Sequence, residues 1–260
     1  MTTTSLPPST VRRFARRHPI AAFSIGAFGL GWPLLGAYTM LGITWLGPVF
    51  TYGALLGSAL LVTASIDGSA GVRRLLLRLL HWRFGIGRWM VVVVAMPALT
   101  LGVAAVTGTL HAPAAGWGGV AWTYLFATFV SGALAVNLAE ETAWSGFVQT
   151  RLAARHGVLR GALLTAPLFA AMHLPLQFAP GWTWGGVAGG AVALLVLAPF
   201  FRYLMGDLLA STGGSLLATG VAHASFNAAN ELGLVGNWQA LPALALLVGA
   251  LAGVRRLRAS

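Results

Sequence analysis

Long apolar segments, interrupted by short stretches that carry arginine, constrain the fold of this 260-residue chain more than any other feature. A helix needs about 20 mostly apolar residues to cross a bilayer, and only 8% of these residues are charged, against about 25% in soluble domains. The sequence therefore predicts an all-α, polytopic integral membrane protein that forms a single transmembrane domain over residues 1–260. The eight predicted spans run roughly over residues 20–41, 44–66, 89–110, 119–150, 159–178, 184–201, 208–230 and 238–254.

The distribution of arginine predicts the orientation of these spans. All 16 basic residues are arginine, and positive residues favour the cytoplasmic side of a membrane. With a basic N-terminus (residues 1–18) in the cytoplasm, eight crossings return the C-terminus to the same side. Every arginine then falls in a cytoplasmic segment, including Arg202 between the sixth and seventh spans. We expect a multi-pass protein of the plasma membrane that contacts lipid. A nucleic-acid partner is excluded because no soluble domain accompanies the basic segments.

Five residues stand out among the polar side chains within the apolar segments, where a bilayer makes such groups costly. Ionisable residues at such positions usually mark function, and together these five could form one site. The chain has no cysteine, so a thiolate nucleophile and a cysteine-bound metal are excluded. The five residues are Glu140 and Glu141 in the fourth span, His173 in the fifth, and His223 and Asn227 in the seventh.

The depth of these side chains predicts that they meet. At a rise of 1.5 Å per residue, Glu140, His173 and His223 lie about 16, 20 and 22 Å from the basic edge of their spans. Three helices therefore place a carboxylate and two imidazoles at a similar depth. Asp207 differs, because it lies near the predicted start of span 208–230, where we expect it to cap the helix.

Two kinds of chemistry fit such a cluster. In the first, a glutamate and a histidine activate water, while the second histidine and the asparagine amide donate hydrogen bonds to an oxyanion. In the second, Glu140, His173 and His223 form a zinc-type ligand set with an open position. The sequence leaves open whether a divalent metal or no cofactor is used.

The three motifs together resemble the CPBP family, the CAAX-protease and bacteriocin-processing group that is also called Abi. Its pattern is EExxxR, FxxxH and HxxxN on separate transmembrane helices, with a catalytic core that would cover residues 119–232 here. The resemblance implies an intramembrane endopeptidase whose substrate is a peptide or a lipidated protein. The eukaryotic CAAX prenyl endopeptidases remove the C-terminal tripeptide of prenylated proteins. The matching residues are Glu140 and Glu141, Phe169 and His173, and His223 and Asn227.

The resemblance also implies a role for each matching residue. Glu140 and His173 would activate the water, His223 and Asn227 would stabilise the oxyanion, and Glu141 would support the site. A hydrolase that cleaves a peptide bond near the C-terminus of a membrane-associated protein is the function expected from these roles.

One position departs from the family pattern. The arginine five residues after the first glutamate is Ser145 here. An arginine at this position would pair with a carboxylate, so Glu141 needs another partner, for which Ser145 and Gln149 are the candidates. The departure supports an alternative function: a non-catalytic membrane immunity or scaffold protein that retains the protease fold.

Overall fold

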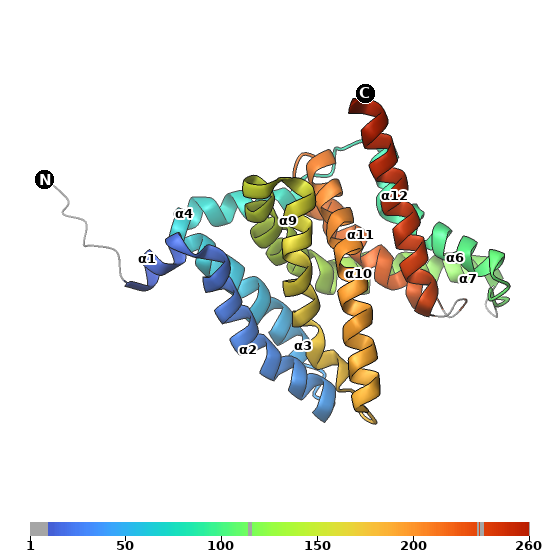
Figure 1. Ribbon diagram of the computed structural model, residues 1–260, viewed down its shortest axis with the longest axis horizontal. Coiled ribbons are helices and arrows are strands. Elements are labelled where there is room, and N and C mark those ends of the chain that lie inside the picture. The colour runs from blue at the N-terminus through green and yellow to red at the C-terminus, as the bar shows by residue number, and fades with distance from the viewer. Residues whose placement is uncertain (1–9, 114–115, 233, 235–236, 260) are drawn as a thin grey trace, which may run out of the picture.

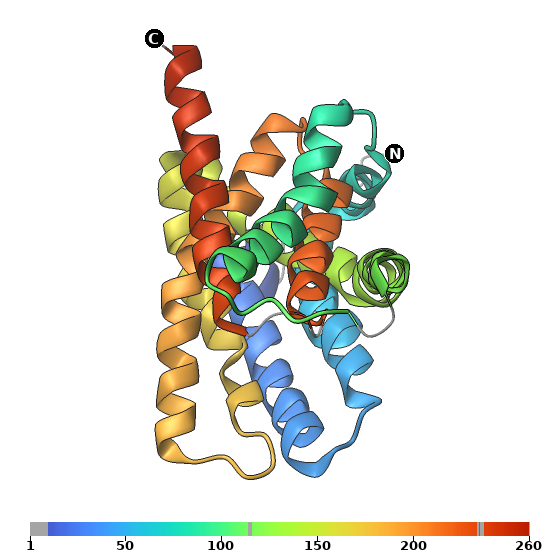
Figure 2. The same cartoon turned by 90° about the vertical axis from the view of Figure 1, so that its right-hand side faces the viewer.

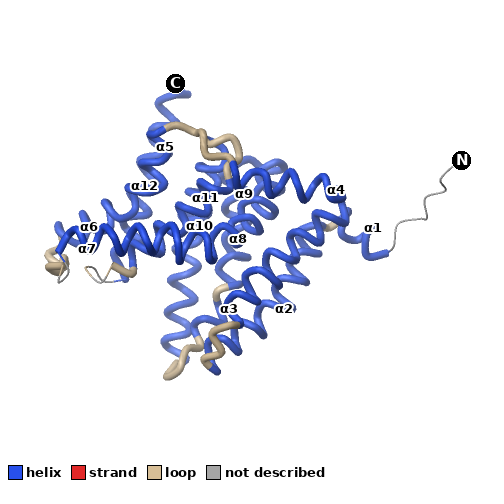
Figure 3. Tube along the Cα trace, turned by 180° about the vertical axis from the view of Figure 1, so that it is seen from behind, coloured by secondary structure: helices blue, strands red, loops and turns tan. Residues whose placement is uncertain are grey.

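The computed structural model describes residues 10–113, 116–232, 234 and 237–259, and it consists of helices joined by short loops. No strand occurs in these residues, which confirms the predicted all-α class (Figures 1 and 3). The α-helices are α1 (Thr10–Arg17), α2 (Pro19–Leu41), α3 (Leu46–Pro48), α4 (Gly57–Leu77), α5 (Ile86–Met90), α6 (Met96–Val106), α7 (Gly116–Phe126), α8 (Leu138–Glu141), α9 (Thr150–Met172), α10 (Trp184–Ser211), α11 (Leu216–Asn230) and α12 (Ala240–Ala259).

Short segments of wider or tighter helix join several of these helices. Most continue the neighbouring helix without a break, so that α7, η4, α8 and η5 form one long helical path. The π-helical segments are η1 (Val49–Leu56), η3 (Val91–Ala95), η4 (Ala127–Asn137) and η5 (Thr142–Gln149), and the 3₁₀ segments are η2 (Arg78–Leu80), η6 (Leu174–Gln177) and η7 (Asn237–Gln239).

Five helical runs in the described residues are long and apolar enough to cross a membrane, which confirms a polytopic membrane protein. The run Gly116–Met172 has 57 residues and would extend about 85 Å if straight, far beyond a bilayer core of about 30 Å. It contains Gly157, whose φ of 80° and ψ of 167° interrupt the helix. The predicted fourth and fifth spans lie on either side of this break. The count of eight spans and the cytoplasmic termini remain predictions. The five runs are Pro19–Leu41, Leu46–Leu80, Ile86–Val106, Gly116–Met172 and Trp184–Ser211.

The sixth predicted span ends too early, and two expectations about its end are wrong. The helix α10 continues to Ser211, so Arg202 lies inside it with a fully buried side chain rather than in a cytoplasmic loop. Asp207 also lies within α10, where it pairs with Arg255, and it caps no helix. Ser215 caps α11 instead, because its hydroxyl accepts a hydrogen bond from the Ala218 amide at 3.0 Å.

The helices that carry the motifs pack side by side in the middle of the molecule. In Figure 1, α9, α10 and α11 lie next to one another, with α2 and α4 on one side and α6, α7 and α12 on the other. The view in Figure 2 shows that α12 runs beside α10. The view from behind in Figure 3 places α8 close to the middle of this arrangement. The chain thus brings its three motif segments into the interior.

Small residues let α11 approach the η4–α8 segment closely. A Cβ atom on Gly220 would lie 3.1 Å from the Leu138 Cα and 2.6 Å from its Cδ2. A Cβ atom on Gly132 would lie 2.9 Å from the Ala224 Cβ. Glycine at helix contacts permits such close backbone approach in membrane proteins. This packing brings His223, which lies between Gly220 and Ala224 on α11, against the two glutamates of α8.

Candidate active site

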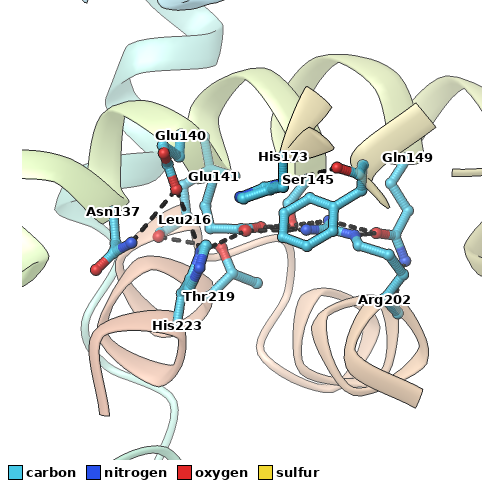
Figure 4. Close-up of polar contacts among 11 residues, drawn as sticks. Asn137, Glu140, Glu141, Ser145, Gln149, His173, Arg202, Leu216, Thr219 and His223 are labelled. Atoms are coloured by element: carbon cyan, nitrogen blue, oxygen red, sulfur yellow. Dashed lines mark hydrogen bonds and ion pairs between the residues drawn. The ribbon is translucent and has the colours of Figure 1, made fainter. Parts of the chain in front are cut away.

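The first motif places two adjacent carboxylates on different sides of one helix. Successive residues of a helix point about 100° apart, whereas residues four apart share a face. Glu141, Ser145 and Gln149 therefore lie along one face, which is turned toward α10. Glu140 points away from that face, and its Oε2 atom accepts a 3.4 Å hydrogen bond from Asn137 (Figure 4).

A buried arginine from α10 holds the inner carboxylate. Arg202 Nη1 donates to both oxygens of Glu141, at 2.9 and 3.1 Å. Its Nη2 donates to Ser145 Oγ at 2.8 Å, and both Nε and Nη2 donate to Gln149 Oε1, at 2.9 and 2.5 Å. The side chains of Arg202 and Glu141 are both 0% exposed. A buried charge is tolerated only when it is paired and hydrogen-bonded, and this network meets that condition.

His223 connects α11 to both glutamates. Its Nδ1 atom lies 3.0 Å from Glu141 Oε1 and 3.8 Å from Glu140 Oε2. A carboxylate only accepts, so the Nδ1–H of His223 donates to Glu141. The ring of Phe201 packs edge-on against the imidazole, with ring centres 4.7 Å apart. His223 is therefore fixed through one nitrogen, which leaves Nε2 for other contacts.

Phe169, the first residue of the second motif, fixes the orientation of the His173 side chain. His173 follows the last residue of α9, and its Nδ1–H donates to the carbonyl oxygen of Phe169 at 2.7 Å. The two rings also pack together, with centres 4.4 Å apart. The four-residue spacing of FxxxH thus orients the imidazole so that Nε2 is the nitrogen without a backbone partner.

Glu140 and His173 line the same cavity, which has a volume of about 350 Å³. Among the described residues that line it, Glu140 supplies the one carboxylate and His173 the one imidazole. The other walls are mostly apolar and come from α2, the loop after it, α3, η1, η4, α9 and η6. These walls are formed by Leu35, Tyr38, Thr44, Gly47, Pro48, Phe50, Thr51, Ala135, Val136, Met172 and Leu176.

The remaining predicted residues lie outside the lining of this cavity. Glu141 and His223 are buried beside it, with 0% and 4% exposure. Asn227 lies one helical turn after His223 and is half-buried. Among the described residues, no hydrogen bond joins its side chain to the glutamates or to either histidine. The structure thus brings four of the five predicted residues into direct or shared contact.

The donor set does not fit a metal centre as it is arranged here. Within the described residues, no three His, Asp or Glu side chains gather in a way that could hold a metal ion. The His223 nitrogen that lies 3.8 Å from Glu140 Oε2 is Nδ1, which donates its proton to Glu141 and so cannot ligate a metal. The chemistry below therefore uses the side chains alone.

Sequence reasoning missed Arg202 as a site residue. The spans are predicted as apolar stretches between charged residues, so Arg202 falls at the predicted end of the sixth span. Ser145 and Gln149 were named as candidate partners of Glu141, and Ser145 does donate a hydrogen bond to its Oε2 atom. Gln149 instead contacts Arg202, both through its Oε1 and by donating Nε2–H to the Arg202 carbonyl at 2.6 Å. The available signal was a single arginine in the otherwise apolar stretch from 184 to 206.

Comparison with known proteins agrees with the motifs. The family model described as "Type II CAAX prenyl endopeptidase Rce1-like" matches residues 125–229 of the chain. This stretch contains the two glutamates, both motif histidines and Asn227. No curated protein matches the chain. The match over residues 125–229 supports assignment to the CPBP/CAAX protease family, whose members are CAAX-type intramembrane proteases.

Proposed function

We propose that this protein is an intramembrane endopeptidase of the CAAX prenyl protease type. It hydrolyses a peptide bond near the C-terminus of a membrane-associated or prenylated protein or peptide. The observation that carries the proposal is the shared cavity of Glu140 and His173, because a carboxylate and an imidazole are the groups that general acid–base activation of water requires. The plasma membrane is the proposed location, with lipid around the helices.

In the proposed reaction, Glu140 takes a proton from a water molecule that His173 orients through Nε2. The hydroxide attacks the carbonyl carbon of the substrate and forms a tetrahedral intermediate. Glu140 then gives the proton to the leaving amine as the peptide bond breaks. The hydrogen bonds from Asn137 to Glu140 and from His173 to the Phe169 carbonyl support this step, because they fix both groups before substrate binds.

The developing oxyanion needs hydrogen-bond donors, and α11 is their proposed source. His223 Nε2 is free of protein partners once Nδ1 donates to Glu141, and a doubly protonated ring would donate from it. Asn227 lies on the same face of α11, four residues further on, and its amide is the second proposed donor. Donors that are already in place lower the barrier because they need no reorganisation during the reaction.

The mostly apolar walls of the cavity support a substrate that reaches the site from the membrane. Leu35, Phe50, Met172 and Leu176 line it beside Glu140, and binding cavities of this type combine an apolar lining with a few polar groups. The walls suit a hydrophobic side chain or a lipid-modified residue near the cleaved bond.

A non-catalytic scaffold or immunity protein is the competing function. Its main support was the serine at position 145, which left Glu141 without the arginine of the family motif. The guanidinium of Arg202 supplies that charge within hydrogen-bond distance of Glu141, and this removes the reason to regard the cluster as vestigial. We therefore favour the enzyme.

A cleavage assay on matched peptides tests the proposed function. The purified protein in detergent is incubated with peptides that differ only in whether a C-terminal cysteine carries a prenyl group, with and without a chelator. We expect products cut near the C-terminus, with a rate that the chelator leaves unchanged because the site does not fit a metal. No cleavage of any peptide by a folded sample would favour the scaffold. A loss of activity with chelator that zinc restores would establish a metal enzyme instead.

A further inference from the structure

The carboxylate of Glu141 lies in the interior and has one full cationic partner from another helix. It is completely buried, and a carboxylate in such a place needs a cation or several donors to remain ionised. Ser145 contributes one hydroxyl hydrogen bond from the next turn of the same helix. The positive charge comes from Arg202, which lies 61 residues along the chain from Glu141, on α10.

We infer that Arg202 is a positioning residue of the active site, taking the place of the arginine that the first motif lacks at position 145. Its guanidinium holds Glu141, and Glu141 in turn fixes the Nδ1–H of His223, so α10 sets the orientation of the imidazole on α11. This inference rests on the proposed function.

Arg202 makes several hydrogen bonds in addition to its ion pair with Glu141, and we call this set of contacts the cradle. Nη1 binds both oxygens of Glu141, Nη2 reaches Ser145, and Nε binds Gln149. The guanidinium carbon also lies 5.3 Å from the centre of the Phe169 ring. Arginine is suited to this role because its planar group presents several donors in fixed directions.

The space around this cradle fits one guanidinium. Ser145 Oγ lies 2.8 Å from Arg202 Nη2, so a long side chain at position 145 would enter the volume that Arg202 fills. Gly206, one turn after Arg202, leaves room for the amide that binds it, because a Cβ atom there would lie 2.5 Å from Gln149 Nε2. In this chain, the small side chain of Ser145 thus leaves the space that Arg202 fills.

Two hydrogen bonds connect Arg202 to His223 by way of Glu141. Glu141 Oε1 accepts from both Arg202 Nη1 and His223 Nδ1, at 2.9 and 3.0 Å. Without the guanidinium, the carboxylate is free to turn, and His223 Nε2 loses its fixed direction toward the substrate. A displacement of about 1 Å in a reacting group can cost about 10²-fold in rate.

Moving the arginine between the two positions tests the inference. We expect Arg202→Ala to lower kcat about 10²-fold with KM nearly unchanged. We expect Ser145→Arg in the same chain (S145R/R202A) to recover at least tenfold, because an arginine at 145 lies four residues from Glu141 on one helix face. Arg155→Gln, at an exposed position, is the matched control and should cleave like the wild type.

Four outcomes are informative, and the thermal midpoint in detergent is recorded for each variant. Wild-type activity in Arg202→Ala overturns the inference and leaves the proposed function intact. A folded S145R/R202A variant no more active than Arg202→Ala also overturns it, because the charge at 145 would then have no effect. If Arg202→Ala does not fold, the neutral pair Glu141→Gln/Arg202→Gln, which has no unpaired charge, should fold and show the same loss of kcat; full activity in it overturns the inference. An inactive wild type contradicts the proposed function itself.

Discussion

His173→Ala should lower kcat by about 10²- to 10⁴-fold, the range expected when a residue that assists proton transfer is removed. The imidazole lies in the cavity with Glu140, and its Nδ1 is held by the Phe169 carbonyl, so Nε2 is the group that orients the water. The variant should stay folded, because the lost side chain is only half-buried. Initial rates on the best peptide, measured at saturating substrate, give the comparison.

His156→Ala provides the matched control for this variant. His156 is exposed on α9 and lies far along the helix from His173, so its removal should change neither kcat nor stability. Equal activity in wild type, His156→Ala and His173→Ala would contradict the role given to His173. A His173→Ala sample that is inactive because it has unfolded would show a lower thermal midpoint than the control.

Glu141→Ala should destabilise the protein by about 3–5 kcal/mol, the usual cost of removing one partner of a buried ion pair. The change leaves the guanidinium of Arg202 completely buried with no carboxylate. The free energy of unfolding in mixed micelles, followed by tryptophan fluorescence during a denaturant titration, measures the loss.

A double variant separates the unpaired charge from the lost packing. Glu141→Leu/Arg202→Met removes both charges and keeps side chains of similar volume, so it should be far more stable than Glu141→Ala, although inactive. Glu231→Ala, at an exposed glutamate, should leave the free energy of unfolding unchanged. A small loss of stability in Glu141→Ala, or a double variant as unstable as the single one, would show that the pair contributes little.

The fold class and much of the site could be predicted from the sequence because both follow from local rules. The apolar segments and their length give a helical membrane protein. The similar depth of Glu140, His173 and His223 predicts that they meet, and the structure places Glu140 and His173 in one cavity and Glu140 near His223. Spacing of four residues explains why Glu141 and Ser145 share a face.

The role of Arg202 could not be predicted because it depends on a contact between distant segments. A charged residue within an apolar stretch predicts the end of a span unless its oppositely charged partner is known. The partner here is Glu141, on a helix far away in the sequence, and it makes a buried arginine acceptable. The same cause shortened the predicted span and misplaced Asp207, whose partner Arg255 is also remote.

The cleavage rate of Glu140→Gln, measured beside the wild type and Glu231→Gln, tests the central claim most directly. The amide keeps the size of the side chain and can still hydrogen-bond with Asn137, but it cannot take a proton from water. We expect a loss of kcat of about 10³-fold or more with an unchanged thermal midpoint, while Glu231→Gln cleaves normally. Wild-type kcat in a folded Glu140→Gln variant would contradict the glutamate-activated water and, with it, the function proposed for this cavity.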